Sequence, residues 1–300
     1  MKPLLPIRFG LRAARRNLRL TVLVYLLSLV PALLVAALAY FDMAPEMERS
    51  LFAGEALAGN RVGVWNDYMR GDGSDFALVT SALLLTALAV AVLRVLTAAG
   101  VVEALLAREH HRERPFLLGV GRHGWRFLRS VVWFGLAVVV LGSLVGAAFT
   151  GVNDFAAERT NGMLQLWGWI GVLAVAFLVF VALDLGYDLS RVAAAAHDDR
   201  RTFVGFFRAV GHALRHPLLL APAWLLFSLA ALGLHLAYVT GRALVQPSSL
   251  GAMALVVVAQ QAVFLAAAFL RVALWGGEIA YYQAAGEPRW CGRKRRRAEG

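Results

Sequence analysis

Six long apolar runs constrain this chain more than any other feature of its sequence. Each run has about 20 or more residues, the length that an α-helix needs to cross the ~30 Å hydrocarbon core of a bilayer. A backbone in hydrocarbon must satisfy its own hydrogen bonds, so continuous runs of this length form helices and not strands. The runs comprise residues 20–41, 76–102, 130–150, 163–187, 217–240 and 249–276.

The sequence therefore predicts an all-α, polytopic membrane protein with six transmembrane helices, forming a single integral membrane domain over residues 1–300. The composition agrees, because 60% of the residues are hydrophobic and only 16% are charged, whereas soluble domains are ~25% charged. Residues 1–19 form a predicted elbow before the first span. Residues 277–300 form a predicted basic tail after the last one.

The distribution of arginine and lysine predicts the orientation of the spans. Of the 30 basic residues, 23 lie in residues 1–19, 103–129, 188–216 and 277–300, and 5 lie in the three opposite loops. Loops rich in Arg and Lys stay in the cytoplasm, so we expect both termini to be cytoplasmic. Only two of the basic residues are lysines. Such arginine use, with much Ala, Leu, Val and Gly, is typical of GC-rich bacterial genomes, and the predicted location is therefore the bacterial inner membrane.

Three basic and apolar segments precede the odd-numbered spans, and we call them elbows. Each mixes large apolar side chains with arginine at near-helical spacing, a pattern typical of a helix in the headgroup region of a membrane. The elbows read RAARRNLRLTVL (12–23), FLLGVGRHGWRFLRSVVWF (116–134) and RAVGHALRHPLLL (208–220).

The ends of the even-numbered spans also resemble one another, and we call them exits. Each exit has a glycine shortly before an acidic residue: Gly100 and Glu103, Gly186 and Asp188, Gly277 and Glu278. Together with the elbows, these exits indicate three copies of one unit, each an elbow, a helix, an outer loop and a returning helix.

This organisation resembles that of uncharacterised bacterial six-helix membrane proteins. They are the kind grouped with YciC-like proteins and with the membrane domain that precedes some glycerophosphodiester phosphodiesterases. RAARRNLRL before the first span and FFRAVGHALRHPLLL before the fifth carry the resemblance. The resemblance implies a membrane scaffold and brings no catalytic motif with it.

Three charged residues lie inside the apolar runs near the arginine-rich ends: Arg94, Asp184 and Arg271. In one interpretation the two arginines extend individually to the headgroups and Asp184 reaches water. In the other, the three residues form a polar cluster whose surplus positive charge binds an anionic ligand or the phosphate of a lipid. Gln260 and Gln261, in the middle of the sixth run, are expected either to form hydrogen bonds between helices or to line a path, and hydrogen bonding between helices is the favoured role.

Four residues of the third arginine-rich segment are weak candidates for a metal site: His197, Asp198, His212 and His216. His212 and His216 are four residues apart and share one face of a helix. The neighbouring arginines disfavour a divalent cation electrostatically, so the sequence predicts no metal and no other cofactor.

The sequence contains no motif of a nucleophilic hydrolase, a P-loop or a dinucleotide-binding domain, so no catalytic residue is predicted. We expect a non-catalytic scaffold, lipid-interacting protein or accessory subunit of a membrane assembly. Its expected partners are membrane lipids, above all anionic headgroups of the inner leaflet, and other proteins of a complex, but not nucleic acid. Two alternatives stay open: a transporter or channel for a small, anionic or lipidic substrate, and a metal-dependent enzyme at the cytoplasmic face.

Overall fold

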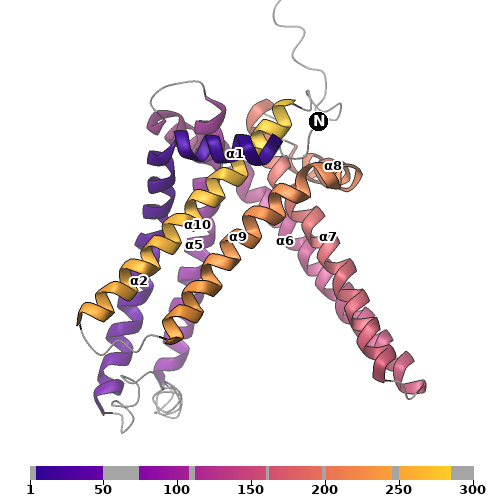
Figure 1. Cartoon of the computed structure of the whole chain (residues 1–300), viewed down its shortest axis with the longest axis horizontal. Helices are drawn as coiled ribbons and strands as arrows, with labels where there is room; N and C mark the ends of the chain where they lie inside the picture. Colours follow the sequence, from indigo (N-terminus) through magenta and orange to yellow (C-terminus); the bar gives the residue numbers. More distant parts are fainter. Residues whose placement is uncertain are drawn as a thin grey trace, which may run out of the picture. The chain divides into compact units, whose positions relative to one another are not determined.

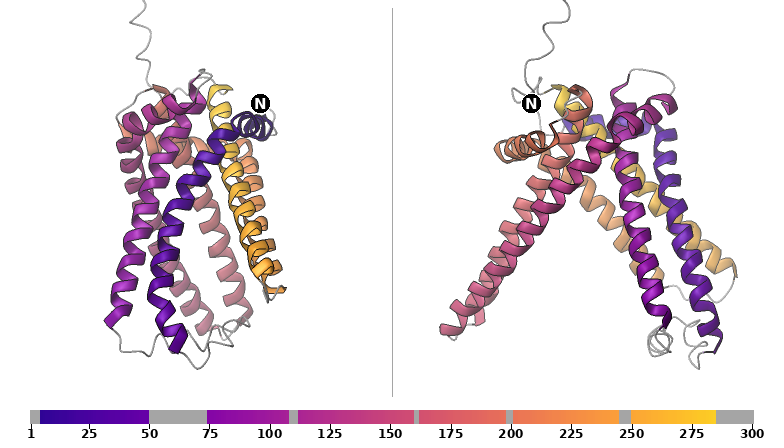
Figure 2. Two further views of the ribbon diagram at one scale, coloured as in Figure 1. Left: turned by 90° about the vertical axis from the view of Figure 1, so that its left-hand side faces the viewer. Right: turned by 180° about the vertical axis from the view of Figure 1, so that it is seen from behind.

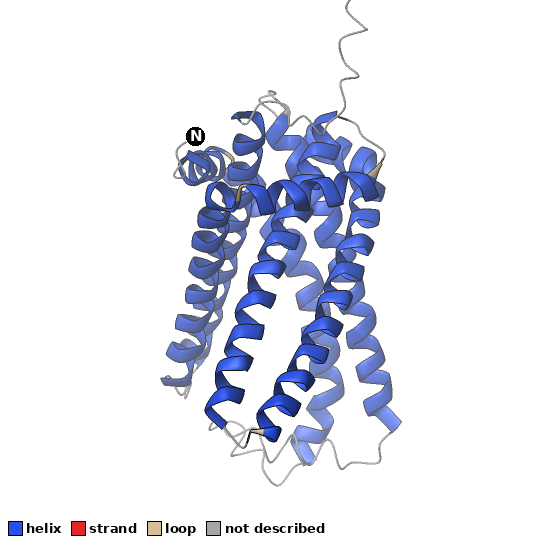
Figure 3. Ribbon diagram, turned by 90° about the vertical axis from the view of Figure 1, so that its right-hand side faces the viewer, coloured by secondary structure: helices blue, strands red, loops and turns tan. Residues whose placement is uncertain are grey.

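The computed structural model describes residues 5–49, 74–107, 112–159, 162–197, 201–244 and 250–284. Within these ranges the chain is helical and contains no strand, as Figure 3 shows. Eight helices are described: α1 (Leu5–Arg16), α2 (Leu18–Arg49), α5 (Ser74–Leu106), α6 (Glu113–Glu158), α7 (Gly162–His197), α8 (Thr202–Arg215), α9 (Pro217–Leu244) and α10 (Leu250–Ala284).

Six of these helices are long and apolar enough to cross a membrane: α2, α5, α6, α7, α9 and α10. Each contains one of the apolar runs, so the predicted all-α multi-pass membrane fold is confirmed. Large apolar side chains such as Leu33, Leu144 and Leu178 are exposed on them. A hydrocarbon solvent accounts for this exposure, because the lipid tails are as apolar as the side chains.

Several helices continue well beyond the apolar runs. The 46 residues of α6 correspond to about 69 Å at ~1.5 Å per residue, roughly twice the hydrocarbon thickness. The second elbow and the third span thus belong to one unbroken helix. The third elbow differs because Pro217 lacks a backbone N–H and excludes the residue before it from helical geometry. His216, with φ −131° and ψ 48°, accordingly separates α8 from α9.

The chain divides into two compact units by its internal contacts. Unit 1 contains residues Met1–Ala13, Ala98–Leu226 and Ala273–Gly300, and unit 2 contains residues Ala14–Thr97 and Phe227–Val272. In unit 1, α6 and α7 lie side by side along their length (Figures 1 and 2), and α8 packs against both. Leu183, Tyr187 and Phe206 form a hydrophobic cluster among these three helices.

Burial in unit 1 is concentrated at the exits of the even-numbered spans. Ala99 and Val101 on α5, Leu189 on α7 and Ala273 on α10 are at most 1% exposed. Further from the exits, the α6–α7 hairpin exposes side chains such as Leu136 along its length. The solvent-excluded core of this unit therefore lies where the exits meet the elbows.

Unit 2 holds polar contacts in the middle of its spans. The Tyr25 hydroxyl on α2 donates a hydrogen bond of 2.8 Å to the Gln261 side-chain oxygen on α10. The Tyr238 hydroxyl on α9 donates one of 3.3 Å to the Gln260 side-chain oxygen. The prediction that the two glutamines join helices is therefore confirmed, and α10 is tied to both α2 and α9.

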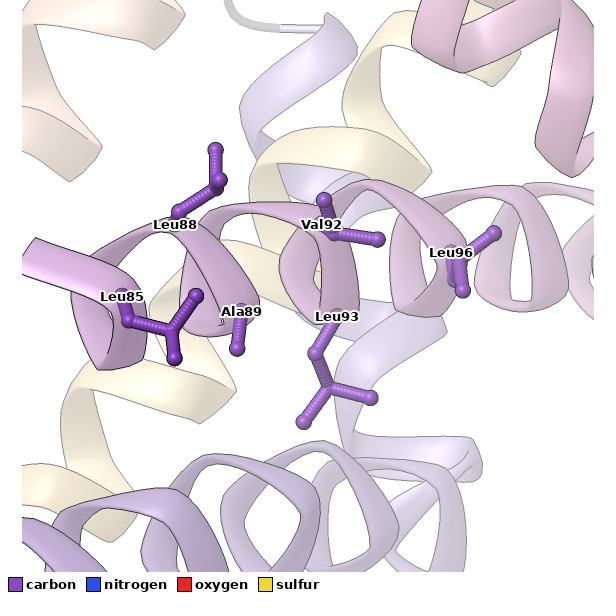
Figure 4. A pocket seen from close by; sticks show the side chains of 6 residues that line it. All are labelled: Leu85, Leu88, Ala89, Val92, Leu93 and Leu96. Carbon is purple, nitrogen blue, oxygen red and sulfur yellow. The ribbon is translucent and has the colours of Figure 1, made fainter. Parts of the chain in front are cut away.

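Unit 2 also carries an apolar groove on α5, with a volume of about 400 Å³. Figure 4 shows its six lining side chains, all from one stretch of α5 between Leu85 and Leu96. The lining contains no charged or hydrogen-bonding side chain, so the groove provides no polar recognition group.

Candidate functional site

In unit 1, a glycine lies at the contact between each elbow and an exit, where the elbows are the N-terminal part of α1, the beginning of α6, and α8. We call these three contacts joints. In the first joint, the exit of α5 meets the beginning of α6. A Cβ atom added at Gly100 would lie 2.5 Å from a ring carbon of Phe116. A Cβ atom added at Gly119 would lie 2.7 Å from the carbonyl oxygen of Ala99. Neither position has room for a side chain, so the two helices approach backbone to backbone.

The second joint brings the exit of α7 against α8. A Cβ atom added at Gly186 would overlap the side chain of Val210 and lie 2.7 Å from its Cα atom. On α8, Phe206, Ala209 and Ala213 are buried. They recur at the three- and four-residue spacing that defines one face of a helix.

The third joint connects the two ends of the described chain. A Cβ atom at Gly277 of α10 would lie 2.7 Å from the carbonyl oxygen of Pro6, and one at Gly276 would lie 2.7 Å from the Cβ atom of Ala13. Gly10 of α1 in turn faces the carbonyl group of Ala273 without room for a side chain. All three exit glycines that the sequence singled out are thus contact points between an exit and an elbow.

An acidic side chain accompanies each joint. The Nε2 atom of His123, whose side chain is fully buried, lies 3.3 Å from the Oε2 atom of Glu103. Asp188 and Glu278 are 3% and 2% exposed. Buried carboxylates are costly unless they are paired, and Glu103 and Asp188 each lie next to a basic side chain.

The acid of the second joint forms a buried ion pair with Arg191, one turn further along α7. The guanidinium carbon of Arg191 also lies 4.0 Å from the ring centroid of Tyr187 and 5.8 Å from that of Phe127. Both charges are at most 4% exposed. Arg191 thus connects the exit of α7 to the elbow part of α6 through Phe127. The charges of Asp188 and Arg191 neutralise each other inside the protein.

The histidines of the predicted metal site are brought together only in part. The rings of His212 and His216 lie 4.9 Å apart, whereas the ring of His197 lies 5.8 Å from that of Tyr282. Asp198 lies outside the described residues. Among the residues that the structure describes, no three His, Cys, Asp or Glu side chains are grouped so that they could hold a metal ion.

His212 instead connects α8 to α10. Its Nε2 atom lies 2.9 Å from the hydroxyl oxygen of Tyr281. Burial is the largest cause that lowers the pKa of His212 below its ordinary 6.5, and the nearby His216 and Arg215 lower it further. Burial and the neighbouring His216 and Arg215 therefore favour the neutral imidazole.

The three predicted intramembrane charges divide between the units. Asp184 belongs to unit 1, where its Oδ2 atom accepts a hydrogen bond of 2.7 Å from the indole nitrogen of Trp224 on α9. Arg94 and Arg271 belong to unit 2, and both side chains are exposed. The cluster of these three charges stays a prediction.

The outer faces of the elbows combine large apolar side chains with arginines. On α1, Phe9 is 43% exposed and Arg12 lies over its ring at 5.7 Å. On α6, Trp125 is 67% exposed and Arg129 lies over its ring at 5.8 Å. On α8, Phe203, Phe207 and Leu214 are exposed, and so are Arg208 and Arg215.

Two contacts of unit 1 were not predicted from the sequence: the ion pair between Asp188 and Arg191 and the hydrogen bond from Trp224 to Asp184. Asp188 and Arg191 are three residues apart, and this spacing alone could have suggested an ion pair on one helix face. Trp224 offered no such signal, because it meets Asp184 from a different span. The comparisons with known proteins matched no family model, no curated protein and no solved structure, so the resemblance of organisation also stays a prediction.

Proposed function

We propose that this chain is a non-catalytic integral membrane protein that binds anionic phospholipids through its elbows and keeps the bound lipids next to its membrane-spanning helices. In this proposal the elbows lie at the cytoplasmic leaflet of a bacterial inner membrane, where anionic lipids attract basic segments. The observation that carries the proposal is the composition of the outer elbow faces, where exposed Phe, Leu and Trp side chains alternate with arginine.

Such a face suits neither water nor hydrocarbon alone. A Trp125 side chain that is 67% exposed leaves much apolar surface uncovered in water, whereas a guanidinium group in hydrocarbon is costly. The boundary between headgroups and acyl chains accommodates both, because the ring enters the acyl region and the arginine meets phosphate. The joints support the proposal further, since they fix which face of each elbow is turned outward.

The ion pair and the mid-span glutamines also favour a lipid-binding scaffold. Arg191 is committed to Asp188, and the oxygens of Gln260 and Gln261 accept hydrogen bonds from tyrosines on neighbouring helices. These groups stabilise helix contacts, as polar side chains in membrane bundles commonly do.

The test compares lipid retention between two double variants with the same change in charge. One, Arg129→Gln with Arg215→Gln, removes two exposed arginines from the elbows. Its control, Arg159→Gln with Arg242→Gln, removes two exposed arginines from the opposite ends of the spans. Native mass spectrometry of the purified proteins, incubated with phosphatidylglycerol or phosphatidylcholine, counts the lipids that each protein retains.

We expect the unmodified protein and the control to retain phosphatidylglycerol in preference to phosphatidylcholine. The elbow variant should retain roughly tenfold less of it, because each basic residue contributes ~1 kcal/mol next to an anionic surface. Equal retention of the two lipids by the unmodified protein, or equal losses in the two variants, would contradict the proposal.

A further inference from the structure

The first elbow differs from the other two in the density and arrangement of its charge. Arg8, Arg12, Arg15 and Arg16 all lie within the 12 residues of α1. Their spacing of four, three and one residues places them on one side of the helix, within ~12 Å along its axis. All four side chains are exposed, and we call this set the α1 stripe.

The opposite side of α1 is occupied by the third joint. Pro6 and Gly10 are buried four residues apart, and Gly10 faces the carbonyl group of Ala273 without room for a side chain. Because this part of α1 cannot rotate without breaking the backbone contact, the side of the helix that carries Arg8 and Arg12 is held pointing away from Ala273. The four guanidinium groups are therefore presented together before any ligand arrives.

No acidic residue of the N-terminal part of the chain balances the stripe. Residues 1–41 contain no Asp or Glu. The other elbows are less dense in charge, since α8 carries only two arginines and the beginning of α6 also carries Glu113. A phosphodiester has a single negative charge, and one or two guanidinium forks satisfy its oxygens. Four arginines within ~12 Å thus carry more positive charge than one phosphodiester can neutralise.

Apolar side chains beside the stripe indicate where its ligand comes from. Phe9 and Leu11 are 43% and 41% exposed, and α2 begins at Leu18, immediately after the elbow. A soluble anion would leave these side chains in water, whereas a lipid supplies acyl chains for them next to its headgroup.

From these observations we infer that the α1 stripe is a binding site for a lipid whose headgroup carries two or more phosphate groups. This inference rests on the proposed function and narrows it to one elbow and one class of lipid. When two phosphates belong to one molecule, both can contact arginines, but the entropy cost of immobilising a ligand is incurred for one molecule and not for two. Arginine suits the role because its planar fork binds phosphate oxygens in pairs.

The experiment measures the affinity of the full-length, detergent-purified protein for three probes. Cardiolipin carries two phosphates, phosphatidylglycerol carries one, and sodium pyrophosphate is the soluble diphosphate. The stripe variant combines Arg8→Gln, Arg12→Gln and Arg16→Gln, and its control combines Arg295→Gln, Arg296→Gln and Arg297→Gln in the basic tail. A third variant combines Arg8→Lys, Arg12→Lys and Arg16→Lys, and it keeps the charge but removes the planar guanidinium groups. Thermal unfolding checks that each variant is folded.

We expect cardiolipin to bind the unmodified protein and the tail control at least tenfold more tightly than phosphatidylglycerol does. The stripe variant should lose at least tenfold in cardiolipin affinity, and the lysine variant should lie between them. A failure of the stripe variant to fold leaves the lysine variant as the test, and its unchanged affinity would overturn the inference.

Three further outcomes would also overturn the inference. Equal losses in the stripe and tail variants would indicate attraction by net charge alone. Pyrophosphate that binds at the stripe as tightly as cardiolipin would move the site from a lipid to a soluble ligand. Cardiolipin that binds no more tightly than phosphatidylglycerol would remove the preference for two phosphates. In that last case, selectivity for phosphatidylglycerol over phosphatidylcholine would still support the proposed function.

Discussion

Individual polar residues in this protein mainly hold helices together. Asp188 and Arg191 neutralise each other in a buried pair, and Asp184 accepts a hydrogen bond from Trp224. Taking either partner away would leave a buried polar group without compensation, and that costs more than the net value of the contact. Of the three candidate ligand residues in the sequence, Asp184 therefore has a structural partner within unit 1.

The bond between Asp184 and Trp224 should be measurable as a coupling energy. We expect Asp184→Ala and Trp224→Phe each to lower stability, and the double variant to lose less than the sum of the two. The coupling should be ~0.6–1.7 kcal/mol, as for other hydrogen bonds between membrane helices. Unfolding in mixed micelles gives the values. Glu158→Ala, at the exposed end of α6, is the control and should show no coupling to Trp224→Phe.

His212 should make the stability of the protein depend on pH. Its pKa in the folded protein lies below 6.5, because of burial first and then of His216 and Arg215. As the pH falls through about 6.5, the unfolded chain binds the proton more readily than the folded one, so the free energy of unfolding decreases. The melting temperature should therefore fall more between pH 7.5 and 5.5 than that of His212→Gln. Parallel melting curves for the two proteins would contradict this role.

At the scale of helices, the sequence predicted those features that depend on residues close together in the chain. Runs of apolar residues predicted all six spans because helix length and lipid thickness are matched. The exit glycines could be picked out because each precedes an acidic residue at the end of an even-numbered span, and the structure shows that each lies where two helices approach closely. The unbroken length of α6 was missed, since nothing in RHGWRFLRS signals whether a helix bends at a membrane boundary. The joint between α1 and α10 was missed because its two sides lie at opposite ends of the sequence.

Glycine substitutions should have opposite effects at the joints and on the lipid-facing helices. Gly186→Ala introduces a Cβ atom that meets the backbone of Val210, and we expect a loss of ~1–3 kcal/mol from overpacking. Gly142→Ala, on α6, meets nothing within 4 Å. It should stabilise the helix by ~0.5–1 kcal/mol, because alanine favours helix more than glycine does. Both values come from unfolding in detergent, and changes of the same sign would argue against tight contact at the joint.

At the scale of the whole molecule, the six spans and their arginines predict which side of the membrane each loop occupies. Reporter enzymes fused after residue 60 and after residue 195 should lie on opposite sides, with residue 195 and both termini in the cytoplasm. The expectation follows from the retention of arginine-rich loops on the cytoplasmic side. Activity of both fusions in the same compartment would overturn the predicted topology, and a fusion after residue 244 provides an independent check on the outer side.

The seating of α1 against Ala273 and Gly277 has a consequence for biosynthesis. The ribosome makes α1 before it makes residues 273–277, and at about 5–20 residues per second the two are separated by on the order of 10–50 s. Throughout that interval the face of α1 that carries Gly10 lacks the α10 surface that covers it in the folded protein. A nascent chain interrupted before residue 273 would therefore present that unpaired face to proteases and chaperones.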